Sequence, residues 1–362
     1  MPNLGRILKP LLIGSAICAA GTVAASAAAA TTLVRRRTAR RSWHTGRTAL
    51  ITGGSRGLGL ALAERFARAG YRVALVARDQ QELARARDLL IERHAVSHPD
   101  HVLTIAADVT DRAQTQSAVQ RAIDHFGRLD VLINNAGIME VAPVENQPLD
   151  AFERSLALHF YAPLHAIQAA LPHMLDRHAA GEKHAASIVN VAGIGGKIAM
   201  PHMLPYSSGK FALVGLSEGL HAELRHKGIR VTTVNPGLMR TGCHVQAHFA
   251  GQPEKEFRWF SMGANAPLLS ATAAAAASKI FDAVESGRAE VHITPQAFLA
   301  ARLHGLAPEA TQFVASYVNR FVLPDASKTS QRTSGADLQA SVERAAAEKA
   351  ARKQGSQQWQ QA

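Results

Sequence analysis

Short runs of aliphatic and β-branched residues alternate with longer helical patterns along most of this 362-residue chain. The runs are almost continuously apolar, which is typical of strands buried on both faces of a parallel sheet. Parallel neighbours are joined by crossover helices, and these crossovers are right-handed. The expected strands are residues 48–51, 72–77, 102–106, 131–133, 187–191 and 229–234, with 290–293 as a candidate seventh. The sequence therefore predicts an α/β protein: a three-layer, doubly wound Rossmann fold with a central parallel sheet of about seven strands.

A glycine-rich turn follows the first expected strand and precedes a helix. Its sequence is Thr52-Gly53-Gly54-Ser55-Arg56-Gly57-Leu58-Gly59. Glycines allow a tight turn and a close approach of the backbone to a diphosphate, and the helix N-terminus offers unpaired N–H groups to phosphates. A glycine-rich loop alone is a weak signal, but this one lies between a strand and a helix, as dinucleotide binding requires. We therefore predict that Gly53, Gly54, Ser55, Arg56, Gly57, Leu58 and Gly59 bind a dinucleotide.

The end of the second expected strand bears on the choice between NAD and NADP. Enzymes that prefer NAD carry a carboxylate there, which binds the ribose 2′-hydroxyl. This chain has Ala77 followed by Arg78. A guanidinium can bind a 2′-phosphate through two charge-assisted hydrogen bonds. The sequence therefore predicts NADP(H) as the cofactor.

The spacing TGxxxGxG over residues 52–59 resembles that of the short-chain dehydrogenase/reductase family. Further motifs follow in the family's order: Asn134-Asn135-Ala136-Gly137, Tyr206-Ser207-Ser208-Gly209-Lys210 and Asn235-Pro236-Gly237. The resemblance covers about residues 46–270. It implies an NADP(H)-dependent oxidoreductase that interconverts a carbonyl and an alcohol by hydride transfer, and it implies a homo-oligomer.

The resemblance also assigns further cofactor contacts. Arg56 matches a second basic position of NADP-preferring members. The other implied contacts are Asp108 and Val109 to adenine, Asn135, Ala136 and Gly137 to the adenosine ribose, and Met239 and Thr241, beside Pro236 and Gly237, to the nicotinamide carboxamide.

Tyr206 and Lys210 are four residues apart, so on a helix they share a face. A free tyrosine has a pKa near 10, too high for efficient acid–base catalysis near neutrality, and a neighbouring ammonium would lower it. The resemblance implies that Tyr206 exchanges a proton with the substrate oxygen and that Lys210 also binds the nicotinamide ribose.

Two positions depart from the family's pattern. The family usually has a serine 13 residues before the tyrosine, which binds the substrate oxygen, and here that residue is Gly193. Losing one such donor typically costs about 10²–10³ in rate, so Gly193→Ser is expected to raise activity if the rest of the site is conventional. His159 stands where the family usually has an asparagine that helps hold a proton-relay water. It either replaces that asparagine as a catalytic residue or is simply a packed helix histidine.

These departures leave three outcomes open: an oxidoreductase in which another group supplies the lost hydrogen bond, a slow or narrowly specific reductase, or a non-catalytic NADP-binding, membrane-anchored protein. The aromatic residues within 243–268 predict an apolar small-molecule substrate, unless they only close the core. No metal site is expected, because His244 and His248 lack an accompanying glutamate.

The N-terminal region contains an uncharged run from residue 11 to 34, followed by Arg35-Arg36-Arg37. About 20 apolar residues suffice to cross a bilayer, and an arginine cluster after an anchor holds that end in the cytoplasm. The favoured interpretation is a single-pass membrane anchor with the catalytic domain facing the cytoplasm. A cleaved signal peptide, suggested by Ala25-Ser26-Ala27, and a soluble or organelle-targeting start remain open.

The net charge of +12 is concentrated near this segment and otherwise scattered, and no nucleic-acid motif is present, so we expect no nucleic-acid binding. We divide the chain into residues 1–44, the anchor and its basic flank; 45–323, the Rossmann-type NADP-binding catalytic domain; and 324–362, a polar tail expected to be disordered apart from a candidate helix over residues 336–353. Residues 313–323 are apolar enough to pack on the protein's own core or to contact a membrane or subunit.

Overall fold

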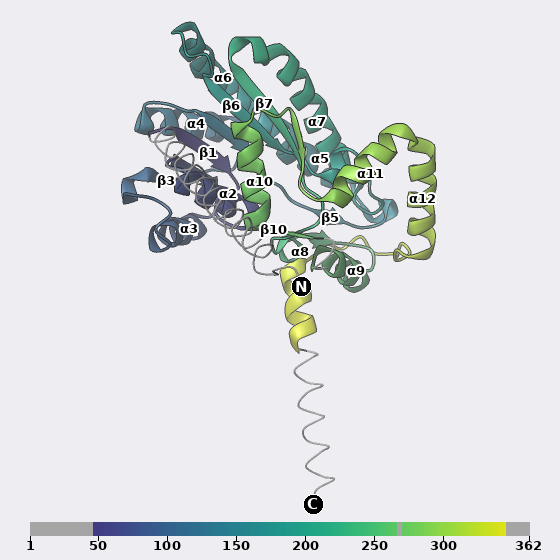
Figure 1. The fold of residues 1–362 in the computed structure, drawn as a ribbon. Coiled ribbons are helices and arrows are strands. Elements are labelled where there is room, and N and C mark those ends of the chain that lie inside the picture. Colours follow the sequence, from purple (N-terminus) through teal and green to yellow (C-terminus); the bar gives the residue numbers. More distant parts are fainter. Residues whose placement is uncertain (1–45, 266–269, 345–362) are drawn as a thin grey trace, which may run out of the picture. The chain divides into compact units, whose positions relative to one another are not determined.

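The computed structural model describes residues 46–265 and 270–344 (Figure 1). A seven-stranded sheet runs through it in the order β11-β7-β6-β4-β1-β2-β3, and all of its pairings are parallel. The strands are β1 (Thr48–Thr52), β2 (Arg72–Ala77), β3 (Val102–Ala106), β4 (Val131–Asn134), β6 (Ala186–Val191), β7 (Ile229–Asn235) and β11 (Glu290–His292). The predicted doubly wound Rossmann fold is confirmed, including its seventh strand.

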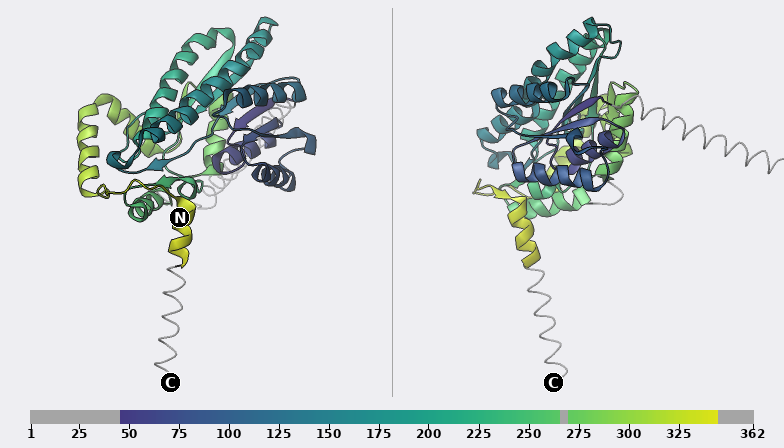
Figure 2. Two further views of the ribbon diagram at one scale, coloured as in Figure 1. Left: turned by 180° about the vertical axis from the view of Figure 1, so that it is seen from behind. Right: turned by 90° about the vertical axis from the view of Figure 1, so that its left-hand side faces the viewer.

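Helices cover both faces of this sheet (Figure 2). The helices of the described residues are α2 (Gly57–Arg68), α3 (Gln80–Glu92), α4 (Arg112–Phe126), α5 (Leu149–Leu156), α6 (Ala162–Ala179), α7 (Leu204–Leu224), α8 (Cys243–Gln246), α9 (Pro253–Asn265), α10 (Ala273–Glu285), α11 (Pro295–Leu306) and α12 (Pro308–Phe321). Because successive strand residues point to opposite faces, Ala49 and Ile51 pack with α2, α3 and α10, whereas Leu50 packs with α4 and α6. The sheet therefore has two buried cores, as a parallel sheet requires.

Two smaller sheets lie beside the main one. One contains β5 (Glu140–Val141), β9 (His248–Phe249) and β12 (Thr333–Ser334), and the other pairs β8 (Met239–Arg240) with β10 (Ala271–Thr272). A π-helical turn, Ala157–Tyr161, separates α5 from α6, and a 3₁₀ turn, Ile194–Gly196, follows β6. Further 3₁₀ turns are Pro99–His101, Val144–Asn146 and Arg225–Lys227.

Helices α11 and α12 form a hairpin that extends from the edge of the domain beyond β11 (Figures 1 and 2). The sequence left open whether residues 313–323 pack on the protein's own core. They do not: Phe313 is 74% exposed and Phe321 is 62% exposed. The apolar composition of residues 313–323 suits packing on the core and contact with a membrane or subunit equally well. Only the direction of the side chains in the structure distinguishes these alternatives.

Residues 335–344 are helical where the candidate helix was expected, whereas residues 324–334 differ from the expected disorder. β12 pairs antiparallel with β9, residues 335–344 are helical, and Leu338 is only 6% exposed. The side chain of buried Asn146 binds this segment through the carbonyl oxygens of Ser327 and Thr329, both at 2.9 Å. Few of its residues are apolar, so its order depends on backbone pairing and one buried leucine, which composition does not reveal.

The predicted membrane segment, residues 11–34, lies outside the described residues. Within residues 46–265 and 270–344, no helix combines the length and the hydropathy needed to cross a bilayer.

Candidate active site

The glycine-rich turn joins the carboxyl end of β1 to α2. Gly53 and Gly57 have left-handed φ values of +64° and +55°, a region that disfavours side chains. A Cβ on Gly59 would collide with the carbonyl oxygen of Gly53. The glycines are thus required by the fold of the turn itself. The first N–H groups of α2 have no intrahelical acceptor, which suits a bound phosphate.

Asn135 and Thr52 hold this turn against the end of β4. The Thr52 hydroxyl oxygen accepts hydrogen bonds from the backbone N–H groups of Asn135 and Ala136, at 3.0 and 3.1 Å. The Asn135 amide donates to the carbonyl oxygens of Thr52 and Gly53, at 3.0 and 3.2 Å. Asn135 therefore acts on the shape of the turn, which is a more specific role than sequence reasoning assigned to it.

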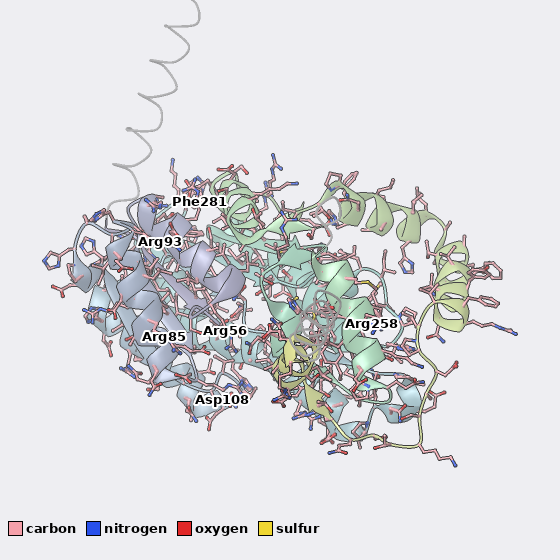
Figure 3. All side chains as sticks on the ribbon, turned by 90° about the horizontal axis from the view of Figure 1, so that it is seen from below. Arg56, Arg85, Arg93, Asp108, Arg258 and Phe281 are labelled. Atoms are coloured by element: carbon pink, nitrogen blue, oxygen red, sulfur yellow. The ribbon has the colours of Figure 1, made fainter. Side chains whose placement is uncertain are left out.

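Arg56, one of the two basic residues predicted to select NADP, lies at the surface near Arg85 of α3 (Figure 3). Arg56 is already paired with Glu82, because Nη1 lies 2.6 Å from Oε1. The Ser55 hydroxyl donates to the other oxygen of Glu82 at 3.1 Å. Arg78 is exposed just before α3. Sequence reasoning missed Glu82, a carboxylate that competes with a phosphate for Arg56.

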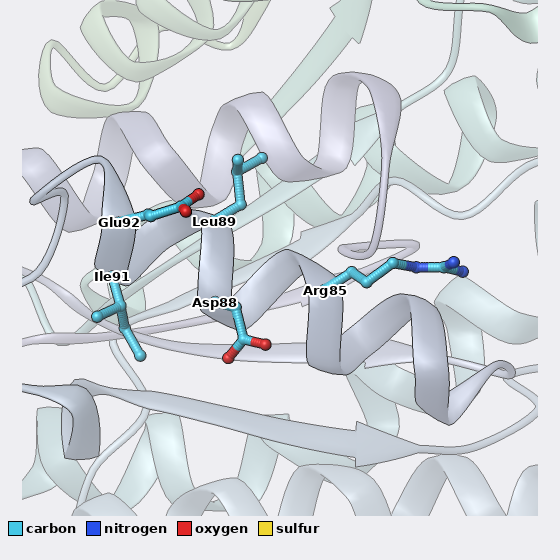
Figure 4. Close-up of a pocket in the computed structure, with 5 residues that line it drawn as sticks. All are labelled: Arg85, Asp88, Leu89, Ile91 and Glu92. Atoms are coloured by element: carbon cyan, nitrogen blue, oxygen red, sulfur yellow. The ribbon is translucent and has the colours of Figure 1, made fainter.

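A hollow of about 250 Å³ lies at this place, lined by Ser55, Arg56, Leu60, Glu82, Arg85, Ala86 and Leu89. A second hollow, of about 320 Å³, is lined by α3 residues alone: Arg85, Asp88, Leu89, Ile91 and Glu92 (Figure 4). Only the first hollow includes residues of the glycine-rich turn, so it is the relevant one for a cofactor phosphate.

The remaining predicted cofactor residues follow other strands of the sheet. Asp108 Oδ1 accepts from the backbone N–H and hydroxyl of Thr110, at 2.9 and 2.7 Å, and Val109 is 7% exposed. The Pro236 carbonyl oxygen accepts from the Ile194 N–H at 2.8 Å. A Cβ on Gly57 would lie 3.4 Å from the Thr241 carbonyl oxygen, which brings the loop after β7 next to the glycine-rich turn.

Tyr206 and Lys210 share one face of α7, as predicted from their spacing. The Tyr206 hydroxyl donates to the Ala192 carbonyl at 3.3 Å, and Lys210 Nζ donates to the Val191 carbonyl at 2.8 Å. Both acceptors lie where β6 ends. Lys210 Nζ is 5.7 Å from the centre of the Tyr206 ring.

Burial sets the protonation of this pair. It lowers the pKa of Lys210, which is 4% exposed, to about 7. Burial, with a smaller contribution from Cys243, raises the pKa of Tyr206 above its ordinary value. Desolvation thus keeps the phenol protonated and makes the lysine ready to release its proton near neutrality.

His159 lies beside this pair, in the π-helical turn. Its Nε2 accepts from the Ile138 backbone N–H at 3.2 Å, so the proton must be on Nδ1, which is 3.0 Å from the Ser155 hydroxyl oxygen. Ser155 in turn donates to the Pro205 carbonyl at 2.6 Å. Burial, and secondarily the charge of Lys210, hold the pKa of His159 well below its usual value. With both ring nitrogens bonded, His159 fits a positioning role better than proton exchange.

Gly193 lies directly against the Tyr206 hydroxyl. Its φ is +114°, and a Cβ there would collide with that hydroxyl. A Cβ on the next glycine, Gly195, would stand 2.5 Å from Tyr206 Cε1. The prediction that Gly193→Ser raises activity was made for a conventional site, and here a serine would be strained by the φ of +114° and would displace the Tyr206 hydroxyl. Here the tyrosine occupies the space that a serine side chain needs.

Sequence reasoning missed a buried polar chain next to the site. The Asn134 amide donates to Asn190 at 2.9 Å, and Asn190 donates to the Ser217 hydroxyl at 3.1 Å. Thr233 also donates to Ser217, at 2.7 Å. The available signal was Asn190, a polar residue near the end of an otherwise apolar strand.

An apolar cluster borders Tyr206 on the other side. Tyr206, Met139, Cys243 and Trp259 pack against a buried group of side chains: Val141, Met203, Ala247, Phe249, Phe257, Phe260 and Leu338. Behind it, His202 and Glu256 are both buried, with Nδ1 2.9 Å from Oε1, and Trp259 Nε1 donates to the other Glu256 oxygen at 2.6 Å. These contacts fix α9 beside the loop that precedes Tyr206.

Residues 47–248 match the family model described as short chain dehydrogenase. A dehydrogenase/reductase SDR family protein 7-like of Anopheles gambiae is 34% identical over 204 residues, which are 56% of this chain and 62% of that relative, less than two thirds of its length. The 2-(R)-hydroxypropyl-CoM dehydrogenase of Xanthobacter autotrophicus is 34% identical over 201 residues, 54% of this chain and 75% of that protein. A short chain dehydrogenase/reductase from Burkholderia phymatum, solved in complex with NAD, is 26% identical, with a TM-score of 0.66 over 74% of this chain and 96% of that one.

Proposed function

The chain belongs to the short-chain dehydrogenase family, and from this premise we propose that it is an oxidoreductase that interconverts a carbonyl and an alcohol with a nicotinamide cofactor. The observation that carries the proposal is the pairing of Tyr206 and Lys210 on one face of α7, at the end of β6. The nicotinamide, when bound, donates or accepts the hydride. The relatives that carry a functional name are dehydrogenases or reductases, so the non-catalytic alternative gains no support.

In this proposal the Tyr206 hydroxyl exchanges a proton with the substrate oxygen. Lys210 stabilises the phenolate that this exchange creates, because its ammonium lies over the ring. His159 holds the Ile138 backbone through Nε2 and the start of α7 through Ser155, and so positions the walls on both sides of Tyr206.

A panel of carbonyls and alcohols tests the activity in the full chain. Tyr206→Phe is expected to bind the cofactor with unchanged affinity and to lose turnover by about 10²–10⁴, the usual contribution of a positioned acid–base group. Turnover that survives Tyr206→Phe, or a wild-type protein that binds the cofactor without turning over any substrate, contradicts the proposal.

We also propose that the cofactor is NADP(H), with Arg78 and Arg56 binding the 2′-phosphate. Arg78 is supported by the lack of a carboxylate at the end of β2 and by its exposure. Arg56 can bind the 2′-phosphate only if its guanidinium leaves Glu82 or if it bonds to the Glu82 carboxylate and the phosphate at the same time. Both residues lie next to or within the glycine-rich turn.

Calorimetric titration with NADPH and NADH tests this preference. Arg78→Asp is expected to weaken NADPH binding about tenfold or more, the loss of one charged hydrogen-bonding group, and to leave NADH binding nearly unchanged. Glu82→Gln is expected to tighten NADPH binding by freeing Arg56. Arg87→Asp, the same charge change at an exposed position of α3, serves as the control, and an equal effect of Arg87→Asp and Arg78→Asp contradicts the assignment.

For the substrate we propose an apolar carbonyl or alcohol, supported by the side chains of Met139, Cys243 and Trp259 around Tyr206.

We further propose that residues 1–44 anchor a catalytic domain, residues 45–323, on the cytoplasmic side of a membrane as a single-pass segment. A reporter fused after Arg41 tests this topology, and activity of the reporter only outside the cytoplasm contradicts it. We also propose that the chain forms a homo-oligomer, which sedimentation of the full chain would measure.

A further inference from the structure

The α11–α12 hairpin carries an unusual concentration of exposed apolar side chains. Nine of the 17 large apolar residues that are exposed in the described part of the chain lie between residues 298 and 322. Leu306 is 84% exposed, Phe313 is 74% exposed and Phe321 is 62% exposed. Contiguous apolar surface of this kind marks an interaction site rather than ordinary surface.

The hairpin's own packing does not use these side chains. On α12, Thr311, Ala315 and Val318 are the partly buried residues, and Thr311 binds His304 of α11, with Oγ1 2.6 Å from Nδ1. On α11, Ala297 is buried and Ala300, Ala301 and His304 are partly buried. Apart from Val318, the partly or fully buried residues of the two helices are thus small or polar, and the large apolar residues are exposed.

The apolar residues of α12 form one stripe. Positions 310, 313, 314, 317 and 321 recur at helical spacing, so they share a face, and this face is about 110° from the partly buried residues 311, 315 and 318. Gln312, Ser316 and Asn319 occupy the opposite side. On α11, Leu299, Leu303 and Leu306 form a second stripe.

Charge identifies the occupant of this face. Glu309 is the one carboxylate between residues 294 and 323, whereas Arg302 and Arg320 are basic, and both guanidinium groups lie over neighbouring aromatic rings, at 5.3 Å from the ring centres. Two copies of the chain docked through this face would bring these arginines together. An apolar face with aromatic residues and bordering arginines instead fits the surface of a bilayer that contains anionic lipids.

Length decides how the hairpin would enter the bilayer. Helices α11 and α12 have 12 and 14 residues, about 20 Å each, which is short of the ~30 Å hydrocarbon thickness. We propose that the α11–α12 hairpin lies in the headgroup region of an anionic membrane, with Leu303, Leu306, Phe313, Tyr317 and Phe321 inserted. This proposal requires neither the oxidoreductase activity nor a particular fate of residues 1–44.

Tryptophan fluorescence on the full chain tests the proposal. Phe313→Trp places the reporter in the apolar stripe, and Asn319→Trp places it on the opposite side of the same helix. With vesicles of phosphatidylcholine and phosphatidylserine that carry brominated acyl chains, Phe313→Trp is expected to show emission at shorter wavelength and strong quenching relative to the wild type. Asn319→Trp is expected to show neither change, because its side chain lies opposite the apolar stripe. Residues 1–44 are the same in both variants, so a difference between the variants reports on α12 and not on residues 1–44. Equal quenching of the two variants, or no quenching of either, overturns the proposal.

A triple variant separates lipid binding from self-association. Leu303→Ser with Phe313→Ser and Phe321→Ser is expected to weaken the hairpin's vesicle contact at least about tenfold, because three apolar side chains no longer leave water, and to leave the sedimentation coefficient without vesicles unchanged. If instead the triple variant dissociates a dimer and the brominated lipids do not quench Phe313→Trp, the face is a subunit interface and the proposal is wrong. Equal melting temperatures show that the variants remain folded.

Discussion

Gly193 and Tyr206 illustrate how one residue determines where its neighbour can lie. With φ at +114° and no Cβ, Gly193 lets the tyrosine hydroxyl come up to the backbone and donate to the Ala192 carbonyl at 3.3 Å. A serine here would displace that hydroxyl. The presence of glycine could be read from the sequence, but its backbone angle and the place of the phenol could not, because both depend on the 3₁₀ turn that follows β6.

Gly193→Ala is expected to lower kcat/KM by about 10², since displacing a catalytic group by about 1 Å has that order of effect. The matched control is Gly215→Ala, at a helix position where a Cβ meets no atom within 4 Å. The control should keep full activity and melt slightly higher, because alanine favours a helix. Steady-state kinetics of Gly193→Ala at or above the wild-type rate would refute the close contact described here.

Lys210 predicts how stability depends on pH. Its pKa is about 7 in the folded protein and about 10.4 in an unfolded chain. Between these two pH values the unfolded state binds more protons than the folded state, so the free energy of unfolding rises with pH. The destabilisation caused by burying the Lys210 ammonium is therefore complete below pH 7 and disappears as the pH approaches 10.4. Lys210→Met should stabilise the protein most below pH 7, and its advantage should shrink between pH 7 and 10. Urea unfolding at several pH values measures this, and Lys279→Met, which removes an exposed lysine that donates to the Ile293 carbonyl at 3.0 Å, is the control.

At the scale of elements, the segment 324–344 is held beside the apolar cluster that borders Tyr206. Arg332 pairs with the buried Glu140 at 3.2 Å, Gly335 N–H donates to the Ala247 carbonyl at 2.8 Å, and Leu338 enters the apolar cluster beside Tyr206. A Cβ on Gly335 would collide with the His244 carbonyl oxygen, so this crossing requires a glycine. The segment thus supports β9 and α9 from outside the main sheet.

Leu338→Ala is expected to loosen β9 and α9, because removing a buried leucine side chain costs about 2–5 kcal/mol. Amide hydrogen exchange should become faster in residues 247–262 and remain unchanged in β1 and β4. Val342→Ala, at a residue of the same helical stretch that is 56% exposed, is the control. Protection of residues 247–262 that is equal in both variants would show that this segment is not supported by Leu338.

The two kinds of sheet also differ in how far sequence could predict them. The strands of the main sheet are continuous apolar runs such as residues 131–134, and all seven were expected. The two-residue strands β5, β9 and β12 have no periodicity to detect, and β12 joins β9 across more than 80 residues of chain. Likewise, Tyr206 and Lys210 were found from their spacing, whereas Glu82 beside Arg56 becomes visible only when α3 is placed against the glycine-rich turn.

At the scale of the whole domain, the sheet order separates two surfaces. β3 and β11 are its opposite edges. The glycine-rich turn and the hollow beside α3 lie toward the β3 edge, and the α11–α12 hairpin follows β11 (Figure 1). A bilayer that contacts the hairpin therefore meets the edge away from the proposed 2′-phosphate site.

This separation predicts that membrane contact leaves cofactor binding unchanged. The affinity of the full chain for NADPH, measured by quenching of intrinsic fluorescence, should agree within about twofold with and without anionic vesicles, because no charge-assisted contact of the cofactor is altered. A tenfold loss of affinity on adding vesicles would mean that the bilayer reaches the β3 edge.

The parallel order of the strands has a consequence for synthesis. β1 lies inside the sheet between β2 and β4, and β4, about 80 positions later in the chain, must be made before the second edge of β1 is paired. Such distant pairing delays closure and leaves intermediates prone to aggregate. The apolar α11–α12 hairpin leaves the ribosome only after all seven strands have been translated. The nascent sheet can therefore close before the most exposed apolar surface of the described residues is made.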